Sequence, residues 1–161
     1  MDTTLTVRHI SIKLDIPFEE FIDNLEKEAG FFNDAVLAEI EASPHDAEEK
    51  INKMAGKENI IIFSSFDRGQ LFKAYGFRMK MKHYIIGNSS AAALMTKLVP
   101  SAALFTPIQL IVYEAENGEV YAAYNLPILY PGELGLEVAE LGLALDIRLK
   151  NLIQSSNSIS A

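Results

Sequence analysis

The stretch that decides the fold is Thr106–Pro127, "TPIQLIVYEAENGEVYAAYNLP". It contains two runs rich in apolar and aromatic residues, separated by an acidic turn with Asn117-Gly118 at its centre. Asn-Gly between two such runs is a strong signal for a β-hairpin, because a tight turn needs a positive φ that glycine adopts at no cost. Two antiparallel strands are therefore predicted here, with Pro127 ending the second.

Strand and helix patterns continue on both sides of this hairpin. Apolar runs predict strands over Thr3–Ile16, Asn59–Phe66 and Gly76–Ile86. The run Asn59–Phe66 is short and apolar, which is typical of a central strand buried on both faces. Helical spacing predicts helices over residues 18–30, 32–40, 43–56, 89–99 and 133–153, and a short one ending near residue 75.

This order of elements mixes hairpins with helices and predicts an α+β fold. We expect a two-layer α/β sandwich with a mostly antiparallel sheet, helices on one face and a long C-terminal helix. A single domain is expected over residues 1–154, with residues 31–57 as an additional helical insertion. Residues 155–161 are expected to form a frayed C-terminal tail.

The predicted C-terminal helix, residues 133–153, carries an unusually wide apolar face. One stripe at helical spacing consists of Leu134, Val138, Leu141, Leu145, Leu149 and Leu152. Leu136, Leu143 and Ile147 widen it beyond what packing on one sheet normally requires. The surplus would be buried either against the helical insertion or across a dimer interface, and the pattern leaves both open.

Composition narrows the functional classes. The chain has 161 residues, a formal charge of -8 and no cysteine. The negative charge argues against a nucleic-acid partner, since such binding depends mainly on Lys and Arg. The absence of cysteine excludes disulfides, thiolate nucleophiles and iron–sulfur clusters. Neither a signal peptide nor an apolar run long enough to cross a membrane is seen, so we expect a cytoplasmic protein without a membrane partner.

Two groups of residues near the middle of the chain are candidate ligand sites. Arg78, Lys80 and Lys82 alternate along one face of a predicted strand, where they would either hold an anion or keep a solvent-facing edge strand from mispairing. His83 falls on the opposite, apolar face, as a haem or metal ligand or as a core histidine with one satisfied nitrogen. Because no metal-binding spacing of histidines and acids occurs, we predict no metal site.

Three further candidates lie at strand and helix ends. Asn88 precedes a predicted helix whose N-terminus would either accept a phosphate or be capped in the ordinary way by the Asn side chain. Tyr124 and Asn125 end the second hairpin strand, where Asn125 would close a turn or act as a polar group in a pocket. Since adjacent strand residues face opposite sides, at most one of these two points into the core.

The segment that contains this hairpin also carries a family resemblance. In order, the residues that carry it are Gly87-Asn88, Met95, Pro100, Ala103-Leu104, Pro107, Glu114, Gly118, Tyr124-Asn125 and Pro127. Their order and spacing resemble the uncharacterised domain-of-unknown-function family numbered 302. The resemblance implies a small two-layer α/β domain with a mostly antiparallel sheet, often found as a homodimer. It implies no reaction, cofactor or catalytic residue.

The sequence departs from that family's pattern in two places. Family members commonly have a short connection after the first helix, whereas this chain carries the helical stretch Phe31–Gly56. Many also place an acid-histidine pair after the second strand, where this chain reads Asp67-Arg68.

Two functional hypotheses follow. The first is a homodimeric binding or interaction module without catalysis, which rests on the absence of a catalytic constellation and on the surplus apolar helix face. The second is an enzyme, or a protein that binds haem or a small anion, whose site assembles from His83, Asn88, Tyr124 and Asn125. It requires these four side chains to converge on one pocket. Neither the cofactor nor the small-molecule ligand is specified by the sequence.

Overall fold

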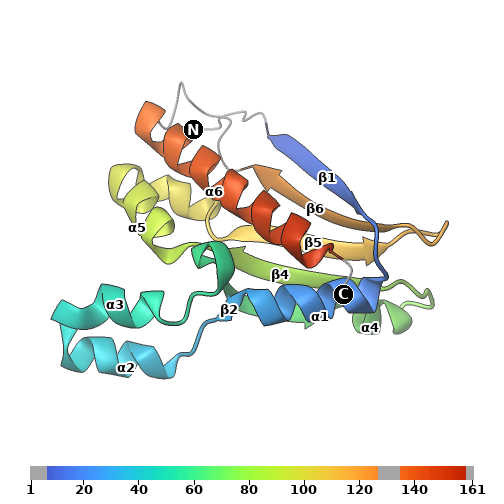
Figure 1. The fold of residues 1–161 in the computed structure, drawn as a ribbon, viewed down its shortest axis with the longest axis horizontal. Coiled ribbons are helices and arrows are strands. Elements are labelled where there is room, and N and C mark those ends of the chain that lie inside the picture. The colour runs from blue at the N-terminus through green and yellow to red at the C-terminus, as the bar shows by residue number, and fades with distance from the viewer. Residues whose placement is uncertain (1–6, 127–134, 159–161) are drawn as a thin grey trace.

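The described residues of the computed structural model, 7–126 and 135–158, form one six-stranded sheet with helices packed on it (Figure 1). The strand order is β1-β6-β5-β4-β3-β2, and only the short β2–β3 pair is parallel. The strands are β1 (Arg8–Leu14), β2 (Gly30–Phe31), β3 (Ile61–Asp67), β4 (Met81–Gly87), β5 (Ile108–Glu114) and β6 (Val120–Leu126). The predicted α+β architecture with a mostly antiparallel sheet is confirmed.

The predicted hairpin is present as β5 and β6. Leu110 pairs with Tyr124, and Glu114 pairs with Val120 next to the turn. Gly118 in that turn has a φ of 81°, which is the conformation that glycine was expected to supply. Pro127, predicted to end the second strand, lies outside the described residues.

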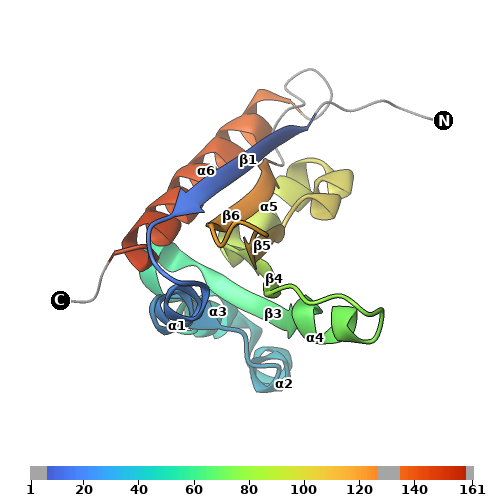
Figure 2. The same cartoon turned by 90° about the vertical axis from the view of Figure 1, so that its right-hand side faces the viewer.

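Two helices, α1 (Phe18–Glu28) and α6 (Leu136–Ser156), lie across one face of the sheet (Figures 1 and 2). The core lies between these helices and the sheet, where Phe21, Leu25, Leu110, Ala122, Leu149 and Leu152 are essentially inaccessible to solvent. Helix α5 (Ser89–Leu98) contacts α6, and Met95 and Val138 form a smaller apolar cluster between the two. None of these described helices is long and apolar enough to cross a membrane.

The helical segment between β2 and β3 projects from the edge of the sheet as the pair α2 (Ala35–Ala42) and α3 (Ala47–Asn52), seen at the lower left of Figure 1. Its two ends meet at Gly30 and Gly56. A Cβ on Gly30 would lie 1.8 Å from the carbonyl oxygen of Met54, so glycine is required for this close backbone approach. Both glycine N–H groups donate to the carbonyl of Ile60, which anchors the segment to the start of β3.

Two strand predictions need correction. The run Asn59–Phe66 was expected to be a central strand buried on both faces, but β3 is covered only along its first residues. Its single outer neighbour, β2, pairs with just Ile61 and Ile62, so the strand is exposed from Ser64 to Asp67. The next strand was predicted to start at Gly76, whereas β4 starts at Met81.

The C-terminal helix was predicted over residues 133–153 and is observed over Leu136–Ser156. Ser156, expected to belong to a frayed tail, is fully buried and its hydroxyl lies 3.3 Å from Glu28. Of the wide apolar face, Val138, Leu145, Leu149 and Leu152 are buried, whereas Leu136, Leu143 and Ile147 remain at least half exposed. Helices α2 and α3 therefore do not cover these three residues.

Candidate functional site: the open face of the sheet

The two faces of the sheet differ in how their polar side chains are satisfied. On the face covered by helices, the Tyr84 hydroxyl donates to Glu26 of α1 at 2.8 Å. The Tyr124 hydroxyl donates to Asp146 of α6 at 2.6 Å, and Lys150 also contacts Asp146. Burial and these carboxylate partners raise the pKa of both tyrosines well above the ordinary value. Polar groups on this face thus find partners within the chain.

Two basic residues of the predicted anion ladder, Lys80 and Lys82, are paired with acids, and the strand is not at the edge of the sheet. Strand β4 lies in the interior of the sheet, between β3 and β5. Lys82 projects to the helix-covered face, where it pairs with Glu26 and lies 5.5 Å from the centre of the Tyr84 ring. Lys80 precedes the strand and pairs with Glu19 and Glu114, whose carboxylates raise its pKa. Arg78 also precedes the strand and is exposed.

The four residues predicted to converge on one pocket are distributed over separate places. Tyr124 points into the core, as described above. Asn88 caps α5 by accepting from the Ala91 N–H at 2.8 Å and also donates to the Asn59 carbonyl. Asn125 is exposed on the opposite face from Tyr124 and lies 2.9 Å from Nδ1 of His9. Of the four, only Asn125 and His83 share a face, two strands apart and in different rows of the register.

The opposite face of the sheet is crossed by no helix of the described chain (Figure 2). Its residues follow from the register, in which Phe66, His83, Ile111 and Ala123 lie side by side across four strands. The neighbouring rows of this face add Ser64, Met81, Ile85, Gln109, Tyr113, Tyr121 and Asn125. We call this surface the open face. A solvated sheet face is normally polar, so the apolar centre of this one is unusual.

Strand β3 leads from the open face into α4 (Arg68–Lys73), whose first residue contacts His83, and into the segment that follows α4. Phe66, Leu71, Tyr75 and Phe77 are all exposed there, with Tyr75 76% and Phe66 46% accessible. The Phe72 and Phe77 rings stack with their centres 4.8 Å apart. Aromatic side chains exposed in a group of this kind mark interaction surfaces.

His83 is the buried polar side chain of the open face, with only 4% of its surface accessible. Its Nδ1 accepts a hydrogen bond from Arg68 Nε at 3.1 Å, and its ring packs on that of Phe66. Nε2 is buried and has no hydrogen-bond partner among the described residues. Burial and the Arg68 charge hold the pKa of His83 below its ordinary value, while the Gln109 side chain acts in the opposite direction.

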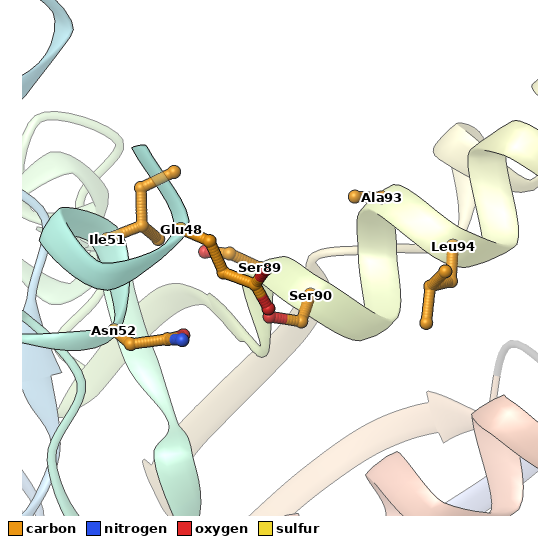
Figure 3. A pocket seen from close by; sticks show the side chains of 7 residues that line it. All are labelled: Glu48, Ile51, Asn52, Ser89, Ser90, Ala93 and Leu94. Atoms are coloured by element: carbon orange, nitrogen blue, oxygen red, sulfur yellow. The ribbon is translucent and has the colours of Figure 1, made fainter. Parts of the chain in front are cut away.

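A recess lies between α3 and α5, away from the open face (Figure 3). It has a volume of about 330 Å³ and is lined by Glu48, Ile51, Asn52, Ser89, Ser90, Ala93 and Leu94. Side chains of α3 face those at the start of α5 across the recess. Its polar groups are at least partly exposed, so none of them requires a ligand there. Among the described residues, no three acids or histidines are grouped to hold a metal ion.

Together these observations define a two-layer α+β protein with one packed face and one open apolar face on the same sheet. Comparison with known proteins gives the family. A sequence model of the domain of unknown function DUF302 matches residues 37–153, and the chain belongs to this family. The fold is similar to the crystal structure of an uncharacterised conserved DUF302 protein from Bacillus stearothermophilus, with a TM-score of 0.65 and 17% identity over 91% of this chain and 96% of that one. No curated protein matches the chain.

Sequence reasoning missed the residues that surround His83. Arg68 was noted only as a departure from the family's pattern, yet it is the side chain that holds the imidazole. Phe66 was assigned to a buried strand. A usable signal was present, because Phe66 and Arg68 flank the residue that caps α4, and His83 alternates with apolar residues on the next strand.

Proposed function

We propose that this protein is a homodimeric binding module without catalytic activity, and that its open face is the dimer interface. The observation that carries the proposal is the exposed Phe66 in one row with Ile111 on this face, together with the exposed Tyr75 and Phe77 in the segment that follows α4. Burying such a surface against a second copy removes it from water, which is the main favourable contribution in protein association.

The composition of the open face supports an interface. Interface centres are enriched in aromatic residues, Met and Arg and depleted in Lys and Glu. The open face carries Tyr113, Tyr121, Met81 and Arg68 in addition to the phenylalanines. The charged pair on this face, Lys13 with Glu119, lies toward its margin on β1 and the hairpin turn. This arrangement of an apolar centre and a polar margin is expected of an interface between two copies.

The catalytic alternative receives less support. Of its four proposed residues, Tyr124 and Asn88 already have structural partners within the chain. His83 and Asn125 share the open face but lie two strands apart. A nucleophile, base and oxyanion donor in mutual hydrogen-bond reach, which catalysis would need, is therefore not assembled from these residues.

The experiment is size-exclusion chromatography with light scattering, run on the whole chain over a range of concentrations. We expect a dimer for the wild type and at least about a tenfold weaker dimer for Phe66→Asp, since a buried carboxylate without a partner costs well over 1.4 kcal/mol. Leu136→Asp is the matched control, because Leu136 is 69% exposed on α6, away from the open face. Circular dichroism checks that both variants are folded.

Two outcomes contradict the proposal. A wild-type chain that stays monomeric at every concentration removes the dimer. A dimer that is abolished by Leu136→Asp and retained by Phe66→Asp moves the interface to the exposed stripe of α6 and away from the sheet.

A further inference from the structure

We propose that Arg68 and His83 form a binding site for the carboxylate group of a small monocarboxylate with an apolar body. The site lies on the open face, so the proposed dimer would cover it. The inference therefore concerns the monomer, to which both residues belong, and the titration below is run at a protein concentration where light scattering shows the monomer. Its starting point is the Nε2 atom of His83, which has no hydrogen-bond partner within residues 7–126 and 135–158.

The hydrogen bond from Arg68 determines what His83 offers. Arg68 Nε is always a donor, so Nδ1 of His83, 3.1 Å away, must be the acceptor and carries no proton. The neutral imidazole therefore carries its proton on Nε2. A buried N–H donor without an acceptor costs about 1–3 kcal/mol. The Gln109 side chain interacts with the imidazole but makes no hydrogen bond with Nε2, so an acceptor atom of a ligand in its place would remove this cost.

Arg68 has donors to spare. Its Nε is engaged by His83, whereas its two Nη groups make no ion pair with any acid within residues 7–126 and 135–158. The neighbouring carboxylate, Asp67, accepts from the Gln70 N–H at 3.0 Å and so caps α4 instead. Arg68 and His83 together thus present N–H donors and a positive charge, which suit a carboxylate oxygen.

The residues around Arg68 and His83 favour an apolar body on the ligand that carries the carboxylate. The Arg68 guanidinium lies 5.3 Å from the centre of the Phe66 ring, and that ring packs against His83. Ile111 and Ala123 continue the same row of the sheet. A monoanion with an aromatic or aliphatic body satisfies the donors and covers this apolar row. A phosphate dianion costs more to desolvate than a monocarboxylate, and Arg68 supplies only one positive charge to offset that cost.

Access to Nε2 requires only surface side chains to move. Phe66 is 46% accessible and Gln109 is exposed, so neither is held by core packing. Gln109 is the side chain whose contact with His83 affects the imidazole pKa. Rotation of Phe66 and Gln109 would open the imidazole edge while the helix-covered core stays intact.

The test is a titration of the ¹⁵N-labelled full chain with benzoate, followed by imidazole NMR signals. The chain has three histidines, so His9 and His45 serve as internal controls. We expect a saturable shift of the His83 signals with a Kd on the order of 1 mM, as is reasonable for a small fragment. Benzamide, which has the same shape without the charge, is expected to leave these signals unchanged.

Variants separate the site from a general effect on folding. Arg68→Gln is expected to weaken benzoate binding by about tenfold or more, since it removes a charge-assisted contact. Arg68 is only partly buried, so this variant is expected to fold. His9→Gln, on the same face of the sheet, is expected to bind benzoate as the wild type does.

Three results would overturn the proposal. An absence of any shift of the His83 signals at high benzoate concentration means that Nε2 is satisfied by a water only. Equal binding of benzamide removes the charge requirement. Inorganic phosphate that binds as tightly as benzoate contradicts the monocarboxylate class. Light scattering in the same buffers tests dimerisation separately, so that failure of the dimer proposal is distinguished from failure of the carboxylate site.

Discussion

Neighbouring residues on one strand differ in burial and in hydrogen bonding, because they lie on opposite faces of the sheet. Leu110 faces the helices and is fully buried, whereas Ile111, the next residue of β5, lies on the open face and is only half buried. Tyr84 on β4 donates to a carboxylate of α1, whereas the adjacent His83 keeps an unsatisfied nitrogen on the open face. The covered face is packed within one chain, whereas the open face keeps exposed apolar side chains and a buried nitrogen without a partner among the described residues.

The largest expected difference between the two faces is in the loss of unfolding free energy on substitution of Leu110 and of Ile111. Leu110→Ala is expected to lower the free energy of unfolding by about 2–5 kcal/mol, because it leaves a cavity between the sheet and the helices. Ile111→Ala is expected to cost clearly less in the monomer. Urea unfolding at low protein concentration measures both. Equal losses would show that the two faces are equally packed within the chain, which contradicts the distinction between them.

A smaller difference in unfolding free energy is expected between substitutions of Tyr84 on the covered face and Tyr121 on the open face. Tyr84→Phe removes a hydroxyl from a buried site and leaves Glu26 with one partner fewer, so we expect a loss of about 1–3 kcal/mol. Tyr121→Phe removes a hydroxyl that donates to Glu119 on the partly exposed open face, and water can replace it there. Its expected effect on the unfolding free energy is close to zero. A larger loss for Tyr121→Phe than for Tyr84→Phe would reverse the comparison.

Alkaline pH tests the same tyrosines without mutating the carboxylates. The folded-state pKa of Tyr84 and of Tyr124 is raised above the unfolded value of about 10, so the folded state resists their ionisation. Stability from these groups is fully present below about pH 10 and is lost as the pH rises above it, at up to about 1.4 kcal/mol per pH unit for each tyrosine. The double variant Tyr84→Phe/Tyr124→Phe is expected to flatten this dependence. An equally steep loss in that variant would assign it to other groups.

The sequence predicted correctly those structural features that are caused by neighbouring residues in the chain. The hairpin and the cap of α5 were correct because Asn117-Gly118 and Asn88 act on their immediate neighbours. The sequence did not predict which side of β4 faces the helices, because the alternation of residues along a strand does not say which face of the sheet the helices cover. Lys82 suggested the solvent side, yet its long stem packs over Tyr84 and its ammonium reaches an acid of α1. Such a pair is a tertiary contact that no local pattern reports.

The sequence also does not show which of the candidate site residues lie together, for the same reason. Tyr124 and Asn125 are adjacent in sequence but lie on opposite faces, and their partners, Asp146 and His9, come from distant segments. Arg68 contacts His83 because α4 folds back beside β4, and that packing is not visible in the spacing of the two residues. His83 was a candidate from its residue type alone, because a histidine among apolar residues is either a ligand-binding residue or a core residue with a hydrogen-bond partner.

The smallest expected effect concerns His83 at mildly acidic pH. Its folded-state pKa is lowered below the ordinary value, first by burial and then by Arg68, so the unfolded chain takes up the proton more readily. The stability that depends on the neutral imidazole is therefore fully present above about pH 6.5 and falls as the pH drops below it, by about 1.4 kcal/mol for each unit of pKa displacement. Urea unfolding between about pH 5 and pH 7.5 measures this fall.

Substitutions distinguish the two causes of that acid sensitivity. Arg68 is the charged group in contact with the imidazole, and Lys82, its neighbour on β4, projects to the other face. His83→Gln is expected to abolish the fall, Arg68→Gln to reduce it, and His9→Gln to leave it unchanged. A fall that persists in His83→Gln would come from the carboxylates of the covered face. The open face would then have no part in the acid response, and the contrast between the two faces would rest on packing alone.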